Sequence, residues 1–401
     1  GGFKQRRSNK VNQTDIPQLL SPRQKRGLTI LAMTGLLAFI AGLFLAPEHA
    51  WSGLLVTGWY VLGLGVAGLC FLAFTAVTNA GWSAAIKRVP EAMTAVLPFG
   101  IVFVLLFSFG VHSVYEWSHE SLLKTDTLLA GKSSWLNTGF FIGRGVAIVA
   151  IWSLLAWRIL HHSLQQDEDR KLSHSAAIVR LGALTMVVVG VTYCLASFDW
   201  IMSLEPHWFS TIFGFYNLAG MFLSGMAMLT ILVIVLRRNG ALSAVVSDEH
   251  LQDLGKILFA ASTFWMYLWF SQYMLIWYSN IPEETSYFIL REQGGWLTFT
   301  VLNVLFNWIL PFAGLISSRA KRNEGLLFKM CILLLVGRWI DISWMVMPPL
   351  TPDGPMLTVW DVLPLAGGIA VFLLLVSWRW NRAPAVPLHD PMLVESLHYH
   401  S

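Results

Sequence analysis

The sequence predicts an all-α integral membrane protein, and three observations carry that prediction. The chain has 401 residues, of which 55% are hydrophobic and only 12% are charged, whereas soluble domains carry about 25% charged residues. The apolar residues gather in runs long enough to cross a bilayer as helices, which takes about 20 residues each. No run shows the alternating pattern of about ten residues that is typical of a membrane β-strand.

Ten segments have the length and apolarity of spanning helices. They are residues 28–46, 52–78, 92–114, 135–160, 178–198, 208–236, 256–279, 296–317, 326–347 and 358–380. A polar stretch precedes the first segment, and no small-residue cleavage site follows it, so we expect an anchor rather than a signal peptide. The chain thus divides into an N-terminal tail (1–27), a transmembrane domain (28–380) and a C-terminal tail (381–401).

The distribution of basic residues predicts the orientation. The chain has 27 Lys and Arg and a net charge of +4. Nearly all of them fall in the two tails or in alternate loops on one side of the expected spans. The exceptions are Lys124, Lys132, Arg144, Arg291 and Arg338. Because loops rich in Lys and Arg stay in the cytoplasm, we expect a multi-pass membrane protein with both termini cytoplasmic. The same sorting argues against a nucleic-acid partner.

The cysteines indicate no metal centre. Cys70, Cys194 and Cys331 each lie alone inside an expected span, and the sequence has no CxxC motif and no His-Cys cluster. We therefore expect this chain to build neither an iron–sulfur nor a zinc site, and to bind no metal.

Polar and ionisable residues inside a membrane are costly and are hypotheses for function by default. Counting 1.5 Å per residue along each span places eight such residues in the outer half or near the midplane. They are His112, Arg144, Asp199, His207, Gln272, Tyr278, Arg338 and Asp341. The inner halves of the expected spans contain no Asp, Glu or His. The sequence therefore predicts a polar cavity, or a path for protons, toward the outer face.

The stretch SFDWIMSLEPHWFS (197–210) holds three of the candidate residues. Glu205 precedes Pro206 at the expected start of a helix, where an acid complements the positive helix end; capping is one interpretation, and docking of a partner is another. Asp199 ends the preceding helix, where the dipole disfavours an acid, so it needs a partner. His207, Arg144 and Arg338 are candidates. A pair of Asp199 and His207 could relay protons.

Two further motifs have similar alternatives. In GRWIDISWMVMPP (337–349), Arg338 and Asp341 are three residues apart, which predicts an ion pair on one helix face that points into the bundle. QYMLIWYSNIPEET (272–285) ends one helix and places Glu283 and Glu284 in the first turn of the next. This is either a capped surface helix or a docking surface for an outer-side subunit.

A histidine pair and a polar segment have interpretations of their own. His112 and His207 lie at similar depth, which leaves a haem ligated by the pair as an alternative. The polar segment 160–176 is expected to be a solvated loop without a function.

The segments SFDWIMSLEPHWFSTIFG, QYMLIWYSNIPEET and GRWIDISWMVMPP resemble the second, smaller NrfD-like (polysulfide-reductase-like) membrane subunit of alternative complex III. That complex is a bacterial quinol:electron-acceptor oxidoreductase of respiratory and photosynthetic electron transport. The resemblance implies two four-helix bundles, here spans 2–5 and 6–9, with spans 1 and 10 flanking them. It implies a larger NrfD-like sister subunit, and outer-side partners that carry iron–sulfur clusters and c-type haems. This chain would hold no redox centre, and its outer cavity would serve protons or a quinone headgroup.

Two other functions stay open. The same residues could form buried pairs in a purely structural anchor of such a complex, surrounded by lipids. A secondary transporter is the third hypothesis, because Pro98, Pro311 and Pro364 interrupt spans and transporters favour broken helices. Their binding sites lie at the midplane, however, and the polar residues here cluster toward the outside.

Overall fold

The fold is built of helices, as the composition predicts. A computed structural model describes residues 18–352, 354–355 and 358–399, and these contain no β-strand. The expectations for residues 1–17 and 400–401 of the two tails lie outside the described residues.

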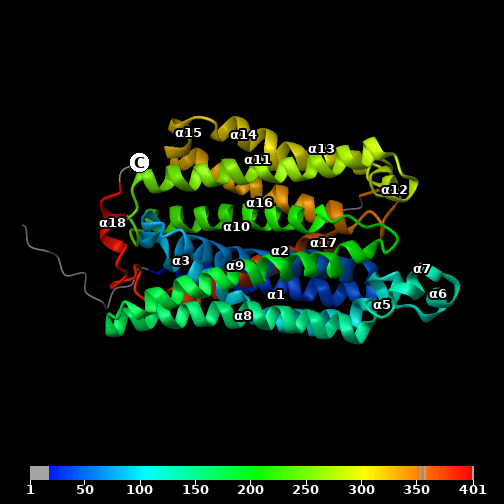
Figure 1. Cartoon of the computed structure of the whole chain (residues 1–401), viewed down its shortest axis with the longest axis horizontal. Coiled ribbons are helices and arrows are strands. Elements are labelled where there is room, and N and C mark those ends of the chain that lie inside the picture. Colours follow the sequence, from blue (N-terminus) through cyan, green and yellow to red (C-terminus); the bar gives the residue numbers. More distant parts are fainter. Residues whose placement is uncertain (1–17, 353, 356–357, 400–401) are drawn as a thin grey trace, which may run out of the picture.

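Long helices run side by side along the long axis of the molecule (Figure 1). The long unbroken ones are α1 (Pro22–Leu45), α2 (Pro47–Val77), α8 (Thr138–Asp169), α9 (Ser173–Trp200), α10 (Ile212–Arg238), α11 (Asp248–Ser279), α16 (Glu324–Val346) and α17 (Val359–Trp380). Two further crossings are broken into α3 (Arg88–Met93), α4 (Phe99–Phe107) and α5 (Val111–Val114), and into α13 (Trp296–Val304) and α14 (Leu310–Leu315).

Short helices cap the two ends of this arrangement. The termini end, where α1 begins and α17 stops, carries α15 (Ser318–Arg322) and α18 (Leu393–Leu397). The opposite end carries α6 (Glu120–Thr125), α7 (Thr127–Lys132) and α12 (Pro282–Leu290) (Figure 1).

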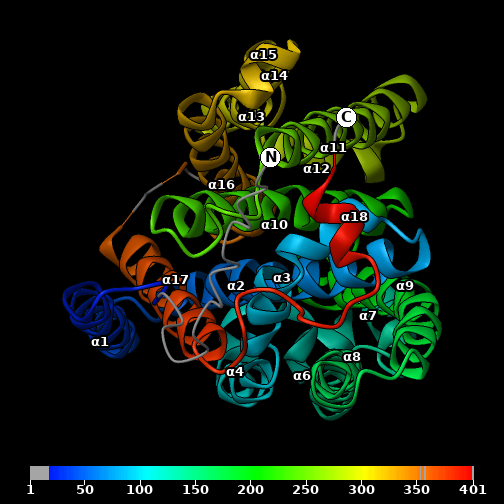
Figure 2. The same cartoon turned by 90° about the vertical axis from the view of Figure 1, so that its left-hand side faces the viewer.

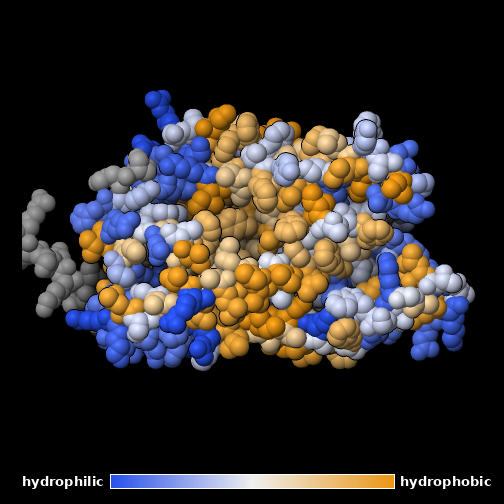
Figure 3. Space-filling model, in the orientation of Figure 1, coloured by the Kyte–Doolittle hydropathy of each residue, from blue (hydrophilic) through white to orange (hydrophobic). Residues whose placement is uncertain are grey.

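The molecule is a multi-pass membrane protein by the length and apolarity of its helices. Within the described residues, eight helical stretches are long and apolar enough to cross a bilayer. Figure 3 shows an apolar band across the middle of one face and hydrophilic residues at both ends. The other two expected spans coincide with α11 and α16, which carry more polar and charged residues, so the number ten stays a prediction.

Two expected boundaries are wrong. Residues 160–176 are not a loop, because α8 continues to Asp169 and α9 begins at Ser173. The turn between these helices is tight, with Arg170 in the left-handed conformation at φ 60°. The helix expected to open near residue 208 begins only at Ile212.

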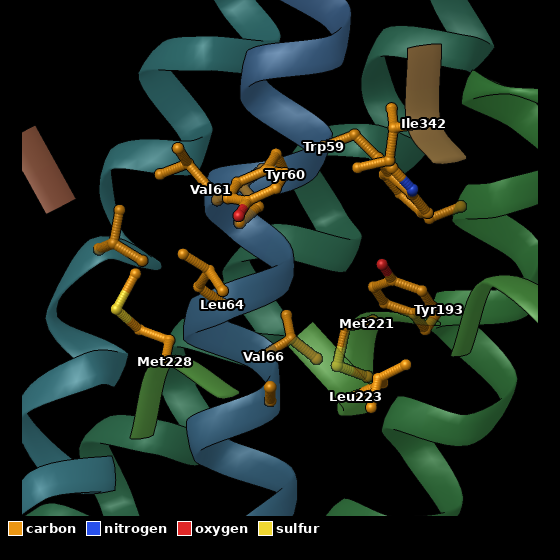
Figure 4. Packing of buried hydrophobic residues seen from close by; sticks show 14 of the residues in the cluster. Trp59, Tyr60, Val61, Leu64, Val66, Tyr193, Met221, Leu223, Met228 and Ile342 are labelled. Carbon is orange, nitrogen blue, oxygen red and sulfur yellow. The ribbon is translucent and has the colours of Figure 1, made fainter. Parts of the chain in front are cut away.

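The core lies along α2 and α10, which are packed on nearly every side. In the most apolar 18-residue stretch of each of these two helices, 78% of the residues are buried. α2 contacts α9, α10 and α17, and α10 contacts α9, α11 and α16, so these two helices lie in the middle while α1 lies at the edge beside α17 (Figure 2). Figure 4 shows Tyr193 of α9 beside Met221 of α10, and the ring of Tyr193 lies 4.7 Å from that of Trp59 of α2.

Small residues let these helices approach closely. A Cβ added at Gly225 of α10 would lie 1.9 Å from the Cβ of Ala67 on α2, and one added at Gly35 of α1 would lie 2.8 Å from the Cα of Gly367 on α17. Membrane helices associate through such contacts because lipid provides no hydrophobic drive between them.

Candidate functional site

Asp199 lies in the last turn of α9 and is paired with arginine. Its carboxylate accepts hydrogen bonds from Arg144 Nε at 2.8 Å and Nη2 at 3.1 Å, and from Trp135 Nε1 at 2.9 Å. Asp199 is 2% exposed. Of the three partners expected for it, the structure selects Arg144 of α8. The two-pronged pair with arginine places a positive charge against the carboxylate, and it offsets the unfavourable position at a helix C-terminus.

His207 pairs with a different carboxylate, so the expected relay between Asp199 and His207 is wrong. His207 Nε2 lies 2.9 Å from Asp126 Oδ2, and the two side chains are 56% and 28% exposed. Asp126 also caps α7 by accepting from the backbone N–H of Leu128 at 2.9 Å. His207 belongs to the turn before α10 and does not open a helix.

A cavity of about 450 Å³ lies between these two pairs, at the end opposite the termini. It is lined by Leu128, Lys132, Trp135, Leu136, Phe198, Asp199, Met202, Ser203, Pro206, His207, Trp208 and Phe209. Lys132 of α7 covers one side and donates a hydrogen bond to the carbonyl oxygen of Pro206 at 2.6 Å. Burial lowers the pKa of Lys132, and the nearby Asp126 opposes that shift. The cavity therefore combines apolar and aromatic walls with three ionisable side chains.

A second charged centre lies deeper, on α16. Arg338 Nη1 donates to Asp341, which confirms the expected pair. Asp341 also accepts from Tyr216 and from Asn303 Nδ2 at 3.0 Å. These contacts, with a further one from Trp265 Nε1 at 3.3 Å, leave Asp341 fully buried and well satisfied. This centre is separate from the cavity.

Glu205 does not cap a helix. Its carboxylate accepts from Arg291 Nη2 at 2.7 Å, and α10 begins seven residues later at Ile212. Arg291 is 1% exposed and lies over the ring of Tyr287, with 3.3 Å between its Cζ and the ring centroid. Arg291 also donates to the carbonyl oxygen of Trp344 at 3.0 Å. The pair thus fastens α12 and the turn before α10 to α16.

The remaining candidates do not join one site. Tyr278 is 84% exposed and Gln272 is buried on another face of α11. His112 is exposed, with Nδ1 3.0 Å from Ser118 Oγ. Glu283 and Glu284 lie in the first turn of α12, as expected.

Sequence reasoning missed a charged cluster at the termini end. Arg88 and Glu91 of α3 are 3% and 2% exposed and form an ion pair. Arg88 also pairs with Asp167 of α8, and Ser163 Oγ donates to Glu91 Oε1 at 2.5 Å. The expectation that this half of the spans lacks acids is therefore wrong at Glu91. The signal was present, since Arg88 and Glu91 have the same spacing of three as Arg338 and Asp341.

The described residues contain no group of three or more His, Cys, Asp or Glu side chains placed to hold a metal ion. Comparison with protein-family models found no match, and neither did comparison with curated proteins.

Proposed function

We propose that the chain is a membrane subunit of a quinol:electron-acceptor oxidoreductase of the alternative complex III type. In this proposal it crosses a bacterial cytoplasmic membrane ten times with both termini inside, as two four-helix bundles (spans 2–5 and 6–9) flanked by α1 and α17. The larger NrfD-like sister subunit lies beside it, and the iron–sulfur clusters and c-type haems are held by outer-side partners. The resemblance of the three motifs, and the location of the cavity opposite the termini, support this proposal.

One observation carries the proposed role of the site: the cavity has an exposed titratable pair at its mouth. Oxidation of a quinol releases protons together with electrons. His207, held by Asp126 at 2.9 Å, carries an imidazole, a group that can accept such a proton and pass it to solvent. Trp135, Phe198 and Trp208 offer flat apolar walls to a quinone ring. The pair of Asp199 and Arg144 fixes the position of Trp135 through hydrogen bonds to its ring N–H and its carbonyl oxygen.

The test uses His207→Gln in the intact complex, with quinol-dependent reduction of the acceptor measured across pH. We expect normal assembly and haem content, a lower rate, and loss of the part of the pH dependence that the imidazole causes. His112→Gln is the matched control, because His112 is an exposed histidine that does not line the cavity. A His207→Gln enzyme with the rate and pH profile of the control would contradict the proposed role.

A purely structural anchor is the second candidate, and the Arg338–Asp341 centre favours it. That centre is buried and its charged groups are hydrogen-bonded, as is typical of an ion pair with a structural role. If His207→Gln leaves catalysis unchanged in an assembled complex, the anchor is the better description of this subunit.

A further inference from the structure

The buried carboxylates of the molecule are not equivalent. Asp199 is held by Arg144 and Asp341 by Arg338, so each of these carboxyl groups has a permanent cation beside it. Asp361, in the first turn of α17, is equally buried at 3% exposed, yet no arginine or lysine of the described chain lies within ion-pair distance of it. A buried carboxylate without a permanent cation favours a positive charge on a titratable neighbour.

The residue that faces Asp361 is a histidine. Nδ1 of His49, in the first turn of α2, lies 3.6 Å from Asp361 Oδ1. The other carboxylate oxygen, Oδ2, caps α17 by accepting from the N–H of Thr358 at 2.8 Å and from its hydroxyl at 2.7 Å. His49 Nδ1 and Asp361 Oδ1 are both buried, and neither has a hydrogen-bond partner within the described residues. Since 3.6 Å is too long for a direct hydrogen bond, the two atoms face each other unsatisfied.

A small cavity adjoins these two residues. Its volume is about 10 Å³, which is close to the minimum that holds one water molecule. Its walls are His49, Trp296, Phe299, Ser343, Met347, Thr351, Pro355 and Asp361. His49 and Asp361, which carry the two unsatisfied atoms, line this space together with the polar residues Ser343 and Thr351. Two to four polar partners are what a buried water requires.

We propose that His49 and Asp361, with one water between them, form a proton-binding site at the end opposite the termini, distinct from the His207 cavity. The pair takes up one proton from solvent: neutral imidazole and carboxylate become imidazolium and carboxylate, and no bond other than N–H forms. The side chain of His49 is 19% exposed against 4% for Asp361, so the histidine is the group that solvent reaches. This inference does not depend on the proposed quinol chemistry.

Apart from His49 and Asp361, no residue that lines the cavity changes its protonation state near neutral pH. From α13 and α16 the cavity meets Trp296, Phe299, Ser343 and Met347, none of which titrates near neutral pH. The last residues of α1 are apolar. Glu48, next to His49 on α2, is the nearest other titratable group on that helix, and it is exposed.

The test compares pH-induced infrared difference spectra of the protein, purified with whatever subunits accompany it, between about pH 7.5 and about pH 5.5, a range that brackets the usual imidazole pKa. The variants are His49→Gln and Asp361→Asn, with Glu48→Gln as the matched control. Asp361→Asn keeps an oxygen that can accept from Thr358, so the cap of α17 is retained and the variant is expected to fold.

In the unmodified protein and in Glu48→Gln we expect protonation of one imidazole coupled to a shift of a carboxylate band. His49→Gln should lose both signals and take up about one proton fewer per chain. Asp361→Asn should lose the carboxylate band and keep normal helicity. Spectra and proton uptake of His49→Gln that equal those of the control would overturn the proposal, as would loss of the imidazole signal without any effect on the carboxylate band.

Discussion

At the scale of single residues, space for the buried Arg338–Asp341 pair is made by a neighbour that lacks a side chain. A Cβ at Gly220 of α10 would lie 2.3 Å from Arg338 Nη1 and 3.4 Å from Asp341 Oδ2. The sequence predicted the Arg338–Asp341 pair because both residues lie on one helix. It could not choose among the candidate partners of Asp199, since Arg144 lies 55 positions away in the sequence and helix spacing carries no information over that distance.

Gly220→Ala should therefore destabilise the protein by about 1–3 kcal/mol, the usual cost of overpacking a filled core. The control is Gly143→Ala in α8, where an added Cβ meets nothing within 4 Å. That change should stabilise its helix by about 0.5–1 kcal/mol, because alanine loses less backbone entropy than glycine. Thermal unfolding of both variants in the same detergent measures the difference. Equal shifts in the two variants would show that Gly220 is not needed for space.

At the scale of elements, one helix is interrupted, and a side chain of the neighbouring helix supplies the missing hydrogen bond. Residues Leu305–Ile309 form a π-helical turn between α13 and α14. Pro311 has no N–H to reach the carbonyl four residues earlier, which is that of Asn307. Ser262 of α11 donates its hydroxyl to that carbonyl at 2.5 Å instead. The interruption at Pro311 was predictable from the sequence, whereas the donor was not, because it comes from another helix.

Ser262→Ala should cost about 1–3 kcal/mol, since it leaves a buried carbonyl without a donor. In a Pro311→Ala background, where residue 311 regains its N–H, the same change should cost less. Unfolding of the two single variants and the double variant gives this coupling as a double-mutant cycle. Strict additivity would mean that Ser262 does not serve the carbonyl left free by the proline.

Element boundaries were the weakest part of the sequence-based prediction. The segment 160–176 is rich in charged and amide side chains, which suggested a loop, but such residues are also good helix formers. Helices α8 and α9 therefore extend past the apolar stretch on which the boundary was based. The Arg88–Glu91 cluster was missed for the same reason: the expected span was drawn from its apolar residues, which begin one residue after Glu91.

At the scale of the whole molecule, the C-terminal segment closes the termini end. Ser396 of α18 accepts from the N–H of Ala85 at 3.1 Å, and its hydroxyl donates to the carbonyl oxygen of Trp82 at 2.6 Å. Nε2 of His250 lies 3.2 Å from Ser396 Oγ, and Nδ1 of His250 accepts from the N–H of Ser247 at 3.2 Å. His250 is thus held in its neutral form between the start of α11 and α18.

This arrangement predicts that α18 detaches in acid. Burial lowers the pKa of His250, and Asp253 opposes that effect. Because the folded pKa lies below the unfolded value of about 6.5, the contribution of His250 to stability is complete above that pH and is lost as the pH falls through the lowered pKa. Hydrogen exchange of Leu393–Leu397, corrected for its intrinsic pH dependence, should show protection falling in acid. His250→Gln should remove this pH dependence, and an unchanged profile in that variant would contradict the assignment.

The short helix α7 decides how the large cavity is reached. It is held down by the contact between Lys132 and Pro206 and by the contact between Asp126 and His207. The His207–Asp126 contact is a partly exposed ion pair, which contributes about 0–1 kcal/mol, so we expect α7 to open by local fluctuation without unfolding of the bundle. The rate at which a molecule enters and leaves the cavity is then set by the movement of α7 and not by the packed walls. A cross-link that immobilises α7 would slow entry and exit without altering the shape of the cavity.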